Sequence, residues 1–443
     1  MHFLSKNIFK IKNQVVRPKA MHFFRQLQKE ASLTPEVRDK LIFSRLAHIV
    51  KLAFDHTEFY RKKYSAAGLT DGVIRTMSDF EQLPPLSRED LRNHFDDIVN
   101  STVTPGNCRT STTGGSSGVP VKVYHDRRVP TDVFSWYVLN QWGGDISDNV
   151  GFLARYNPQK TRIPYNKLIW YPTSRCFIDV SMLTAERFEQ FYKECLRISP
   201  KYLQGYVGAV QEFAGFLEKN NLVLPSVKFV WTTSAPLSES NRAYMERIFK
   251  APVYSQYGCC EVFWLAYECK VKNGLHYFDT ARHFDVCDSN LKPVPDDTEG
   301  ELLLTDLLNY SFPIIRYRNG DRVCKLSRSC CCGCGFPLIG KVKGRMTDII
   351  RLPDGSSVPG DFMTTLFDDF PEAVAGFQVI QHADFSLTLR YVAANDSSAL
   401  VVESVCEKLR KRFEKNAIIV NSEAVDCITH DRGKIRFVVS ELK

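Results

Sequence analysis

Helical and strand-like segments alternate in the middle of the chain, and this alternation restricts the fold more than any other sequence feature. Apolar spacing predicts helices over residues 209–218 and 239–249 and short buried strands over residues 227–231 and 253–256. Strands that alternate with helices form a mostly parallel sheet, because each helix returns the chain across one face of that sheet. The sequence therefore predicts the α/β fold class.

The length of the chain predicts more than one domain. Its 443 residues exceed the size at which a single hydrophobic core stops growing. After Gly300 strand-like patterns dominate, and after Arg345 a compact tail begins. We predict a large N-terminal domain of mixed sheets and helices over residues 1–343 and a small α+β C-terminal domain over residues 344–443. In this tail we expect strands at 377–381, 386–392 and 417–420 and a helix at 398–413.

The composition is that of a soluble globular enzyme. Hydrophobic residues make up 44% and charged residues 24%, and no segment approaches the roughly 20 apolar residues that span a bilayer. The first residues lack the pattern of a secretory signal peptide, so we expect a cytoplasmic protein whose cysteines are reduced. A homodimer is left open by the sequence.

The first thirty residues are strongly basic and almost free of acids. An anionic membrane or a nucleic acid would suit this charge, but no RNA-binding aromatic motif and no helix-turn-helix accompanies it. We interpret the segment as a solvated, partly frayed leader and expect no nucleic-acid partner. Its basic residues are Lys6, Lys10, Lys12, Arg17, Lys19, Arg25 and Lys29.

Two segments before residue 100 have structural interpretations. Apolar residues recur at helical spacing over residues 35–67, which predicts an amphipathic helical entry. Ser87 stands three residues before Asp90 and just ahead of an apolar position, which is the pattern of a helix N-cap. Neither segment indicates catalysis.

A run of hydroxyl and glycine residues is a candidate phosphate-binding loop. Glycines allow backbone N–H groups to converge on an anion, and hydroxyls add further donors. The run has neither the end of a Walker loop nor a dinucleotide fingerprint, and by itself such a run is more often a solvated turn. It consists of Thr113, Gly114, Gly115, Ser116, Ser117 and Gly118.

Five later motifs support a functional interpretation of this loop. They occupy residues 231–237, 254–261, 313–321, 344–350 and 431–436. Together with the loop they resemble, in order and spacing, the motifs of the adenylate-forming superfamily. The resemblance is closest to its phenylacetate-CoA ligase branch, which includes relatives encoded with capsule and surface-polysaccharide genes. It extends from about residue 40 to the C-terminus, and it implies a large adenylate-forming domain followed by a mobile C-terminal domain.

The resemblance implies an ATP site assembled from these motifs. In the family the glycine-rich loop holds the β and γ phosphates, the second motif backs the adenine, and a tyrosine lies near the base and the α phosphate. An aspartate accepts hydrogen bonds from both ribose hydroxyls, as an acceptor-only carboxylate can. Besides the loop, the matching positions are Ser234, Ala235, Pro236, Gln256, Tyr257, Gly258, Asp321 and Arg345.

Two charged residues would carry the chemistry. Glu261 would help to hold Mg²⁺, since a carboxylate beside phosphates requires a hard cation between them. Lys434 would bridge the incoming carboxylate and the α phosphate and neutralise charge while pyrophosphate leaves. The chain departs from the family pattern at Val119, Ala235, Cys260 and Thr347.

A cysteine cluster predicts a zinc site. Cys269 and His276 follow the Mg²⁺ glutamate, and Cys332 and Cys334 follow the ribose motif. Three sulfurs and one imidazole are the ligands of a closed, structural tetrahedral Zn²⁺ site. The branch that the chain resembles has such a site, and the spacing to the hinge favours Cys332 and Cys334, although Cys330 and Cys331 stay open as ligands. Reduced packing cysteines are the alternative.

Three aromatic residues lie in segments that line the acyl pocket in the resembled family. Trp136 and Tyr137 follow the phosphate loop, and Tyr206 precedes the adenine motif. Aromatic side chains there are compatible with an aryl acid, and they are equally compatible with ordinary core packing.

These features together predict an AMP-forming acid–thiol ligase. Its partners would be a carboxylic acid, ATP with Mg²⁺, and CoA, and the product would be a thioester formed through an acyl-adenylate. One alternative keeps adenylation but transfers the acyl group to an amine or hydroxyl, such as that of a sugar or amino acid. Another alternative is a catalytically idle scaffold, which the four departures from the family pattern favour.

Overall fold

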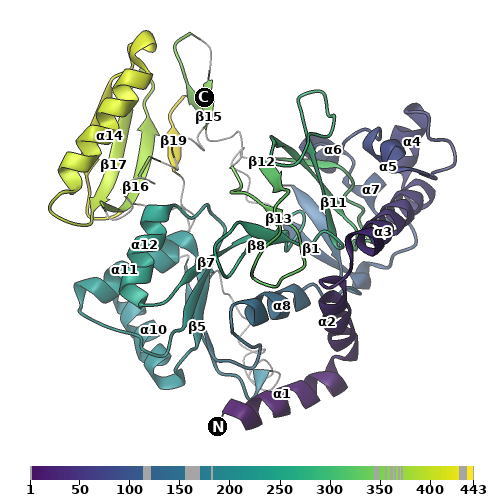
Figure 1. Ribbon diagram of the computed structural model, residues 1–443, viewed down its shortest axis with the longest axis horizontal. Coiled ribbons are helices and arrows are strands. Elements are labelled where there is room, and N and C mark those ends of the chain that lie inside the picture. Colours follow the sequence, from purple (N-terminus) through teal and green to yellow (C-terminus); the bar gives the residue numbers. More distant parts are fainter. Residues whose placement is uncertain are drawn as a thin grey trace. The chain divides into compact units, whose positions relative to one another are not determined.

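The chain folds into two compact units, each assembled from separate stretches of sequence (Figure 1). The computed structural model describes residues 2–112, 121–154, 170–180, 183–343, 349–354, 357–359, 363, 366–367, 370, 373–428 and 437–442. The first unit comprises Met1–Lys10, Gly144–Gln256 and Met346–Lys443, and the second comprises Ile11–Gly143 and Tyr257–Arg345. This grouping differs from a division at residue 344, because the C-terminal residues share a core with residues 144–256. A separately moving C-terminal domain stays a prediction.

A parallel sheet forms the centre of the first unit, as the alternating pattern predicts. Its strand order is β7-β6-β5-β3-β4, and every neighbouring pair is parallel. The helices α10, α11 and α12 lie beside it (Figure 1). The elements are β3 (Val150–Ala154), β4 (Arg175–Asp179), α10 (Ala185–Ile198), β5 (Tyr202–Tyr206), α11 (Val207–Lys219), β6 (Phe229–Thr233), α12 (Glu239–Phe249) and β7 (Val253–Tyr257).

The α/β class is confirmed, while β6 is shifted by two residues and β7 ends one residue later than predicted. The predicted strand at 227–231 is β6, which starts two residues later because its pairing with β5 begins at Tyr202 opposite Phe229. Periodicity identifies a buried strand, but its neighbour decides where the ladder begins.

The C-terminal part of the first unit is a small α+β assembly. Its four-stranded sheet has the order β18-β17-β16-β19, and α14 packs on β17 and β18. The strand predicted at residues 417–420 is β18. It starts at Val420, three residues after the predicted start, because a turn of 3-10 helix, η3 (Glu414–Asn416), intervenes. The elements are β14 (Ile349–Arg351), β15 (Ser357–Pro359), β16 (Val374–Gln381), β17 (Leu387–Ala393), α14 (Ser398–Arg412), β18 (Val420–Ala424) and β19 (Val438–Ser440).

A close contact joins the two parts of the first unit. Gln211 of α11 donates a hydrogen bond from Nε2 to the carbonyl oxygen of Ala375 in β16. A Cβ atom on Gly376 would lie 2.3 Å from that same Nε2 atom, so a larger residue would require the end of the Gln211 side chain to shift. Phe213, Met245 and Phe377 lie in one continuous core with 2% exposure or less.

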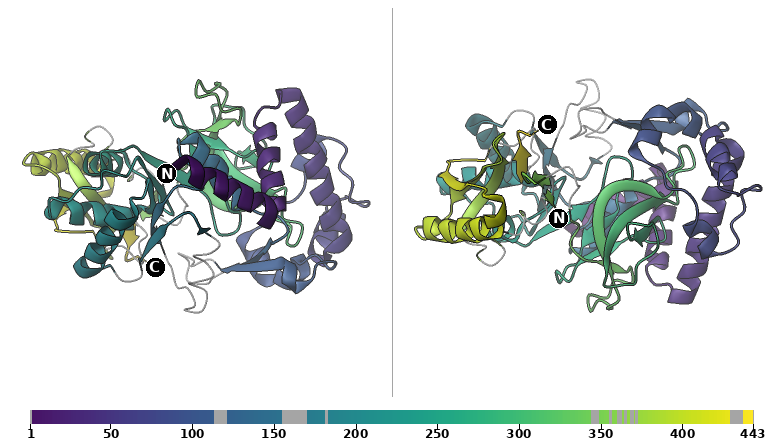
Figure 2. Two further views of the ribbon diagram at one scale, coloured as in Figure 1. Left: turned by 90° about the horizontal axis from the view of Figure 1, so that it is seen from below. Right: turned by 90° about the horizontal axis from the view of Figure 1, so that it is seen from above.

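The second unit combines helices with an antiparallel sheet (Figure 2). The sheet order is β10-β11-β12-β13-β9-β8, and a separate hairpin pairs β1 with β2. Its strands are β1 (Cys108–Thr112), β2 (Lys122–Asp126), β8 (Ala266–Glu268), β9 (Leu275–Tyr277), β10 (Arg282–Cys287), β11 (Glu299–Asp306), β12 (Tyr317–Leu326) and β13 (Leu338–Ile339). Its helices are α2 (Pro18–Glu30), α3 (Pro35–His56), α4 (Glu58–Ala66), α5 (Met77–Glu81), α6 (Arg88–Asn93), α7 (Phe95–Ile98), the short η1 (Pro105–Asn107) and α8 (Val133–Gln141).

The predicted helical entry over residues 35–67 consists of two helices, α3 and α4. Thr57 ends α3 and caps α4, because its hydroxyl oxygen accepts a hydrogen bond from the backbone N–H of Tyr60. The predicted cap at Ser87 is present as a full capping box with Asp90. Within the described ranges, the helices are all too short or too polar to cross a bilayer.

Candidate functional site

The carboxyl ends of the parallel strands bring three predicted residues to one edge of the first unit. Tyr206 ends β5, Ser234 follows the last residue of β6, and Gln256 lies near the end of β7. In the register of the sheet, Tyr206 pairs with Thr233. Open α/β sheets commonly bind ligands at this edge, which is consistent with the predicted roles of these residues.

The turn after β6 has a specific backbone conformation. Ser234 adopts a left-handed φ of 76°, which is uncommon for a residue other than glycine and often occurs at functional turns. Ala235 packs against the core of the first unit, and Ser238 then caps α12 by accepting a hydrogen bond from the backbone N–H of Asn241. The predicted adenine-backing turn, which also includes Pro236, is thus held at both ends.

In the second unit, β12 presents alternate residues on one buried face. Tyr317, Asn319 and Asp321 are 1%, 7% and 6% exposed. The hydroxyl of Tyr257 donates to Oδ2 of Asp321 over 2.5 Å, and the amide of Asn319 donates to the same oxygen over 2.6 Å. Burial and the neighbouring Asp321 carboxylate raise the pKa of Tyr257 well above its ordinary value, so the tyrosine remains a donor.

Glu261 lies in the same unit and is fully buried. Its Oε1 accepts a hydrogen bond from the hydroxyl of Tyr317 over 3.1 Å and lies 3.4 Å from Nη1 of Arg88. Its Oε2 is buried and has no hydrogen-bond partner among the described residues. A buried carboxylate oxygen without a donor is costly, and a hard cation such as Mg²⁺ would satisfy it. The residues present therefore fit the predicted metal.

Sequence reasoning missed Arg88, His125 and Tyr317 as neighbours of this site. Arg88 is the first residue of α6, directly after the predicted cap, and Tyr317 stands two residues before Asn319 in β12. His125 contacts the carbonyl oxygen of Cys260 through Nε2 over 3.0 Å. Alternation along β12 could have indicated Tyr317, whereas no local pattern indicates the other two.

His125 is held as a neutral ring. It is 6% exposed and stacks on Phe263 with ring centroids 4.0 Å apart. Burial lowers its pKa to about 4, despite the opposing hydrogen bond to Cys260. This ring therefore supports the loop that carries Glu261 without adding charge.

Several predicted site residues lie outside the described residues. They are the phosphate loop Thr113, Gly114, Gly115, Ser116, Ser117 and Gly118, the hinge residue Arg345, and Lys434. Gly258 is described and follows the last residue of β7. The roles of all these residues stay predictions.

The predicted zinc ligands converge in the second unit. Cys269, His276, Cys330 and Cys332 place one ligand atom each within 4.8 Å of the others. Sγ of Cys269 lies 3.3 Å from Sγ of Cys330, and Nε2 of His276 lies 3.2 Å from Sγ of Cys332. Nδ1 of His276 is 2.7 Å from the carbonyl oxygen of Phe336, which can only accept a hydrogen bond. Nε2 is therefore left to bind a metal.

Cys334, which the sequence favours as a ligand, is placed beside this group. Its Sγ lies 3.0 Å from the hydroxyl of Tyr267 and 3.7 Å from that of Tyr137. Burial opposes ionisation of its thiol, but neighbouring His276 and Tyr267 lower its pKa overall. The structure thus brings together three of the four predicted ligands and adds Cys330.

The predicted acyl-binding aromatics of α8 are buried in packing contacts. Trp136 and Tyr137 are 4% and 5% exposed. Trp136 packs edge-on against Phe24 of α2, and the guanidinium of Arg17 lies over its indole at 5.1 Å. The contacts described for these two residues are those of the core, and their part in acyl binding stays a prediction.

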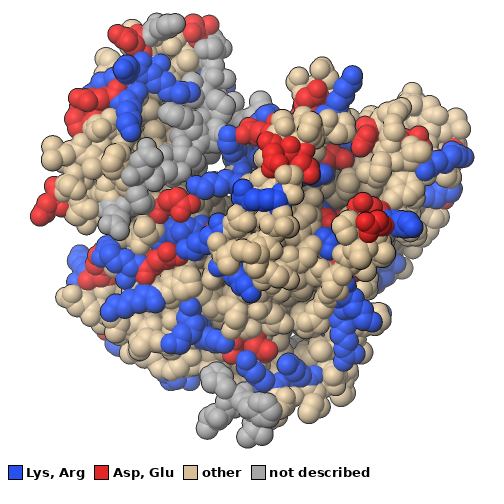
Figure 3. All heavy atoms as spheres, in the orientation of Figure 1, with Lys and Arg blue, Asp and Glu red and all other residues tan. Residues whose placement is uncertain are grey.

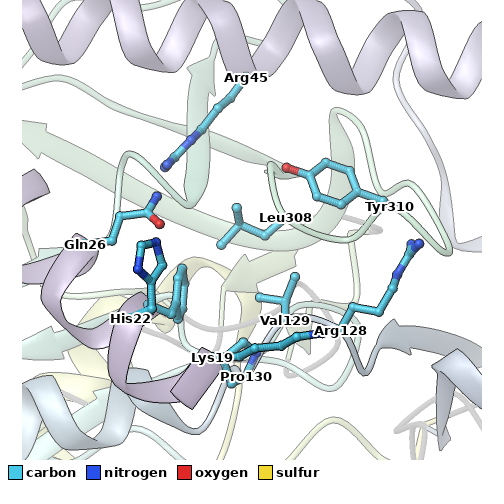
Figure 4. A pocket seen from close by; sticks show the side chains of 10 residues that line it. Lys19, His22, Gln26, Arg45, Arg128, Val129, Pro130, Leu308 and Tyr310 are labelled. Carbon is cyan, nitrogen blue, oxygen red and sulfur yellow. The ribbon is translucent and has the colours of Figure 1, made fainter. Parts of the chain in front are cut away.

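A cavity of about 460 Å³ opens on another part of the second unit (Figure 4). Two of its cations, Arg45 and Arg128, are engaged by Glu30 and Asp126. No predicted site residue lines it. The lining residues are Lys19, His22, Phe23, Gln26, Arg45, Arg128, Val129, Pro130, Leu308 and Tyr310.

The fold matches that of known acyl-CoA ligases. The structure of a 2-hydroxyisobutyryl-CoA ligase in the postadenylation state superposes with a TM-score of 0.74 at 18% identity, covering 94% of this chain and 92% of that one. The amide bond synthetase McbA from Marinactinospora thermotolerans superposes with a TM-score of 0.52 at 14% identity, covering 74% of this chain and 68% of that one. The fold is therefore that of the adenylate-forming enzymes.

Sequence comparison indicates which branch of these enzymes the chain resembles. No family model matches the chain. It is 22% identical over 411 residues to the protein CapK of Staphylococcus aureus, covering 88% of this chain and 86% of CapK. It is also 22% identical over 360 residues to a phenylacetate-coenzyme A ligase of Thermus thermophilus, covering 77% of this chain and 78% of that enzyme. These findings confirm the recognised resemblance to the adenylate-forming superfamily on its phenylacetate-CoA ligase-like branch.

Proposed function

We propose that the protein activates a carboxylic acid with ATP and transfers the acyl group to CoA. In the first step a carboxylate oxygen attacks the α phosphorus, and pyrophosphate leaves. In the second step the CoA thiolate attacks the acyl carbonyl, and AMP leaves. The observation that carries the proposal is the fully buried Glu261, whose Oε2 lacks a partner among the described residues, in the same unit as the bonded pair of Tyr257 and Asp321.

The residues of the second unit have separate tasks in this reaction. Asp321 would accept hydrogen bonds from the ribose hydroxyls, and Tyr257 and Asn319 orient its carboxylate. Glu261 would hold Mg²⁺, which screens the phosphate charge when it is bound. Arg88 and Tyr317 fix the Glu261 carboxylate at its other oxygen. Pre-set positions of this kind lower the barrier by avoiding reorganisation during the reaction.

Lys434 is the proposed catalytic cation of the first step. Its ammonium would offset the negative charge that builds up between the attacking carboxylate and the α phosphate. Arg345 and the Thr113–Gly118 loop would hold the nucleotide. The support for these roles is their match, in order and spacing, to the motifs of the resembled family.

Pyrophosphate exchange into ATP tests the proposal. We expect a panel of carboxylic acids to contain at least one that stimulates exchange. Lys434→Ala should reduce this exchange by about a hundredfold or more. Lys219→Ala, on the exposed end of α11, is the matched control and should retain full activity. Undiminished exchange in Lys434→Ala would refute the lysine assignment, and absence of exchange with every acid would favour an idle scaffold.

The acceptor is tested separately. Because the fold is similar to that of an amide bond synthetase, an amine is the second candidate for the acyl acceptor. A hydroxyl of a sugar or amino acid is grouped with the amine as an alternative to CoA. With acid, ATP and CoA together, a CoA ligase yields a thioester that mass spectrometry detects. Accumulation of acyl-AMP with CoA, and its conversion by amines, would favour the second candidate.

A structural zinc completes the proposed enzyme. Cys269, His276, Cys330 and Cys332 supply the soft and borderline ligands that tetrahedral Zn²⁺ prefers. A fourth protein ligand leaves no position for water, so zinc would stabilise the fold rather than take part in the reaction. An aryl acid as substrate remains a proposal that rests on Tyr206 and the aromatic character of α8.

A further inference from the structure

The N-terminal helix α1 (His2–Val16) has an exposed apolar stripe that the proposed reaction does not use. Ile8, Ile11 and Val15 are 44%, 63% and 77% exposed. Because they are spaced by three and then four residues, they lie on one face of the helix. Phe9 and Asn13, on the other side, are each 5% exposed. The helix therefore presents aliphatic side chains to solvent, and it is not the frayed leader that its charge predicts.

The same segment is basic without compensating acids. From residue 2 to residue 29 the sequence contains no aspartate and no glutamate. Arg17 pairs with Asp132 across 2.7 Å. The remaining cations with no ion pair among the described residues are Lys6, Lys10, Lys19, Arg25 and Lys29. Basic side chains gather over α1 and α2 (Figure 3).

We propose that α1 docks the protein on the surface of an anionic lipid bilayer. Ile8, Ile11 and Val15 would enter the boundary between headgroups and acyl chains, while Lys6 and Lys10, on the same helix, would add electrostatic attraction to the anionic surface. A helix of 15 residues is about 22 Å long, shorter than the hydrocarbon layer of about 30 Å, so it lies on the surface and does not cross it.

Charge and exposed apolar surface together favour an anionic bilayer over a second copy of the chain or a nucleic acid. A second copy of the chain on the same stripe would bring two uncompensated basic helices together, and like charges oppose such an interface. A nucleic acid would use the lysines, but its phosphate backbone gives exposed isoleucine and valine side chains no role. An anionic bilayer can bind both the aliphatic stripe and the basic side chains of this segment.

Vesicle co-sedimentation of the full chain tests the proposal. One set of vesicles contains phosphatidylcholine alone, and the other contains phosphatidylcholine with phosphatidylserine. We expect binding to the anionic set, weakened by salt because the exposed charges are screened. The triple variant Ile8→Ser, Ile11→Ser, Val15→Ser should lower the affinity more than tenfold. The double variant Lys6→Gln, Lys10→Gln should lower it about fivefold for each lysine removed.

A matched control removes the same kind of exposed apolar surface elsewhere. Leu196 of α10, Val223 of the loop before β6 and Leu400 of α14 are 50%, 52% and 78% exposed. Their combined change to serine should leave vesicle binding unaltered, and unchanged circular dichroism confirms that each variant is folded.

Three results would overturn the proposal. The first is no binding to anionic vesicles at low salt, including the case in which the chain binds duplex or single-stranded nucleic acid instead. The second is equal loss of binding in the α1 variant and the control. The third is a wild-type dimer that the α1 variant converts to a monomer, because the stripe would then be covered by a second copy.

Discussion

Two buried polar clusters in the second unit differ in whether the chain satisfies them by itself. In the first, Tyr257 and Asn319 both donate to Asp321, yet Oε2 of Glu261 has no partner among the described residues. In the second, Cys269 and His276 meet two further cysteines so closely that a single ion could satisfy all four. We therefore predict that the first cluster binds a ligand that arrives and leaves during the reaction, and that the second binds a metal ion that stays in place.

This difference predicts separate consequences for activity and for stability. Changes in the nucleotide cluster should impair the reaction while the fold persists, because their polar groups are poised for a ligand. Changes in the cysteine cluster should loosen the fold, and activity should fall because the fold does.

The largest expected effect is on the stability of the cysteine cluster. Removal of zinc by a chelator, or the change Cys269→Ser, should cost on the order of 5 kcal/mol and lower the melting temperature by about 10 °C or more. Calorimetry and metal analysis measure both quantities. Cys331→Ser is the control, because Cys331 is the exposed member of the same loop. A protein that contains no zinc as purified, with an unchanged melting temperature after chelation, would contradict the site.

The same measurement decides between two candidate sulfur ligands. Cys330 belongs to the converging group, whereas Cys334 contacts the hydroxyl of Tyr267. Cys330→Ser should therefore lose zinc at lower chelator concentration than Cys334→Ser. The reverse order would restore the ligand pair that the sequence favours, Cys332 with Cys334.

A smaller free-energy change is expected from Glu261→Gln, and it should appear in activity. Loss of the carboxylate should slow pyrophosphate exchange about a hundredfold to a thousandfold, or about 3 to 4 kcal/mol. Stability should change little, since Arg88 is 25% exposed and can turn to water. Glu301→Gln, which breaks the more exposed pair with Arg318, is the control. If Glu261→Gln loses as much thermal stability as Cys269→Ser, the proposed difference between the two clusters is wrong.

Gly335→Ala should disturb the attachment of the cysteine loop to the end of α2. A Cβ atom on Gly335 would lie 1.8 Å from the carbonyl oxygen of Ala31, and backbone atoms cannot easily move away. We expect a loss of about 2 kcal/mol in the free energy of unfolding, measured by urea denaturation. Gly106→Ala meets no atom within 4 Å and should be nearly neutral. Equal stability of the two variants would show that the loop is not held there.

The effect that is smallest at neutral pH is a pH dependence of stability at His125, beside the nucleotide cluster. The pKa of His125 is lowered by burial from 6.5 to about 4, so the unfolded chain binds a proton before the folded chain does. Its contribution is complete above pH 6.5 and is lost as pH falls towards 4, by up to about 1.4 kcal/mol per pH unit. His125→Gln should flatten this slope of stability against pH, whereas exposed His22→Gln should not. Equal slopes of stability against pH for wild type and His125→Gln would refute the assignment of this pH dependence to His125.

The local elements were predictable because periodicity and caps act over short distances. The helix over residues 239–249 and the Ser87 cap are as expected. The division of the helical entry at Thr57 is visible only in the structure, because a cap inside an apolar pattern resembles a continuation of that pattern. The grouping of residues 144–256 with the C-terminal residues could not be read from composition, since it depends on a shared core.

For the site, the sequence by itself predicted which residue types would carry the chemistry, and it gave the order in which they occur. Motif order identified Tyr257, Glu261 and Asp321, and the resemblance to adenylate-forming enzymes gave them roles. Tertiary structure alone decided that Arg88 and Tyr317 hold one oxygen of Glu261 and that Cys330 joins the cysteine cluster. The reason is physical: spacing along the chain sets which face a side chain occupies, whereas pairing between distant strands sets which faces meet.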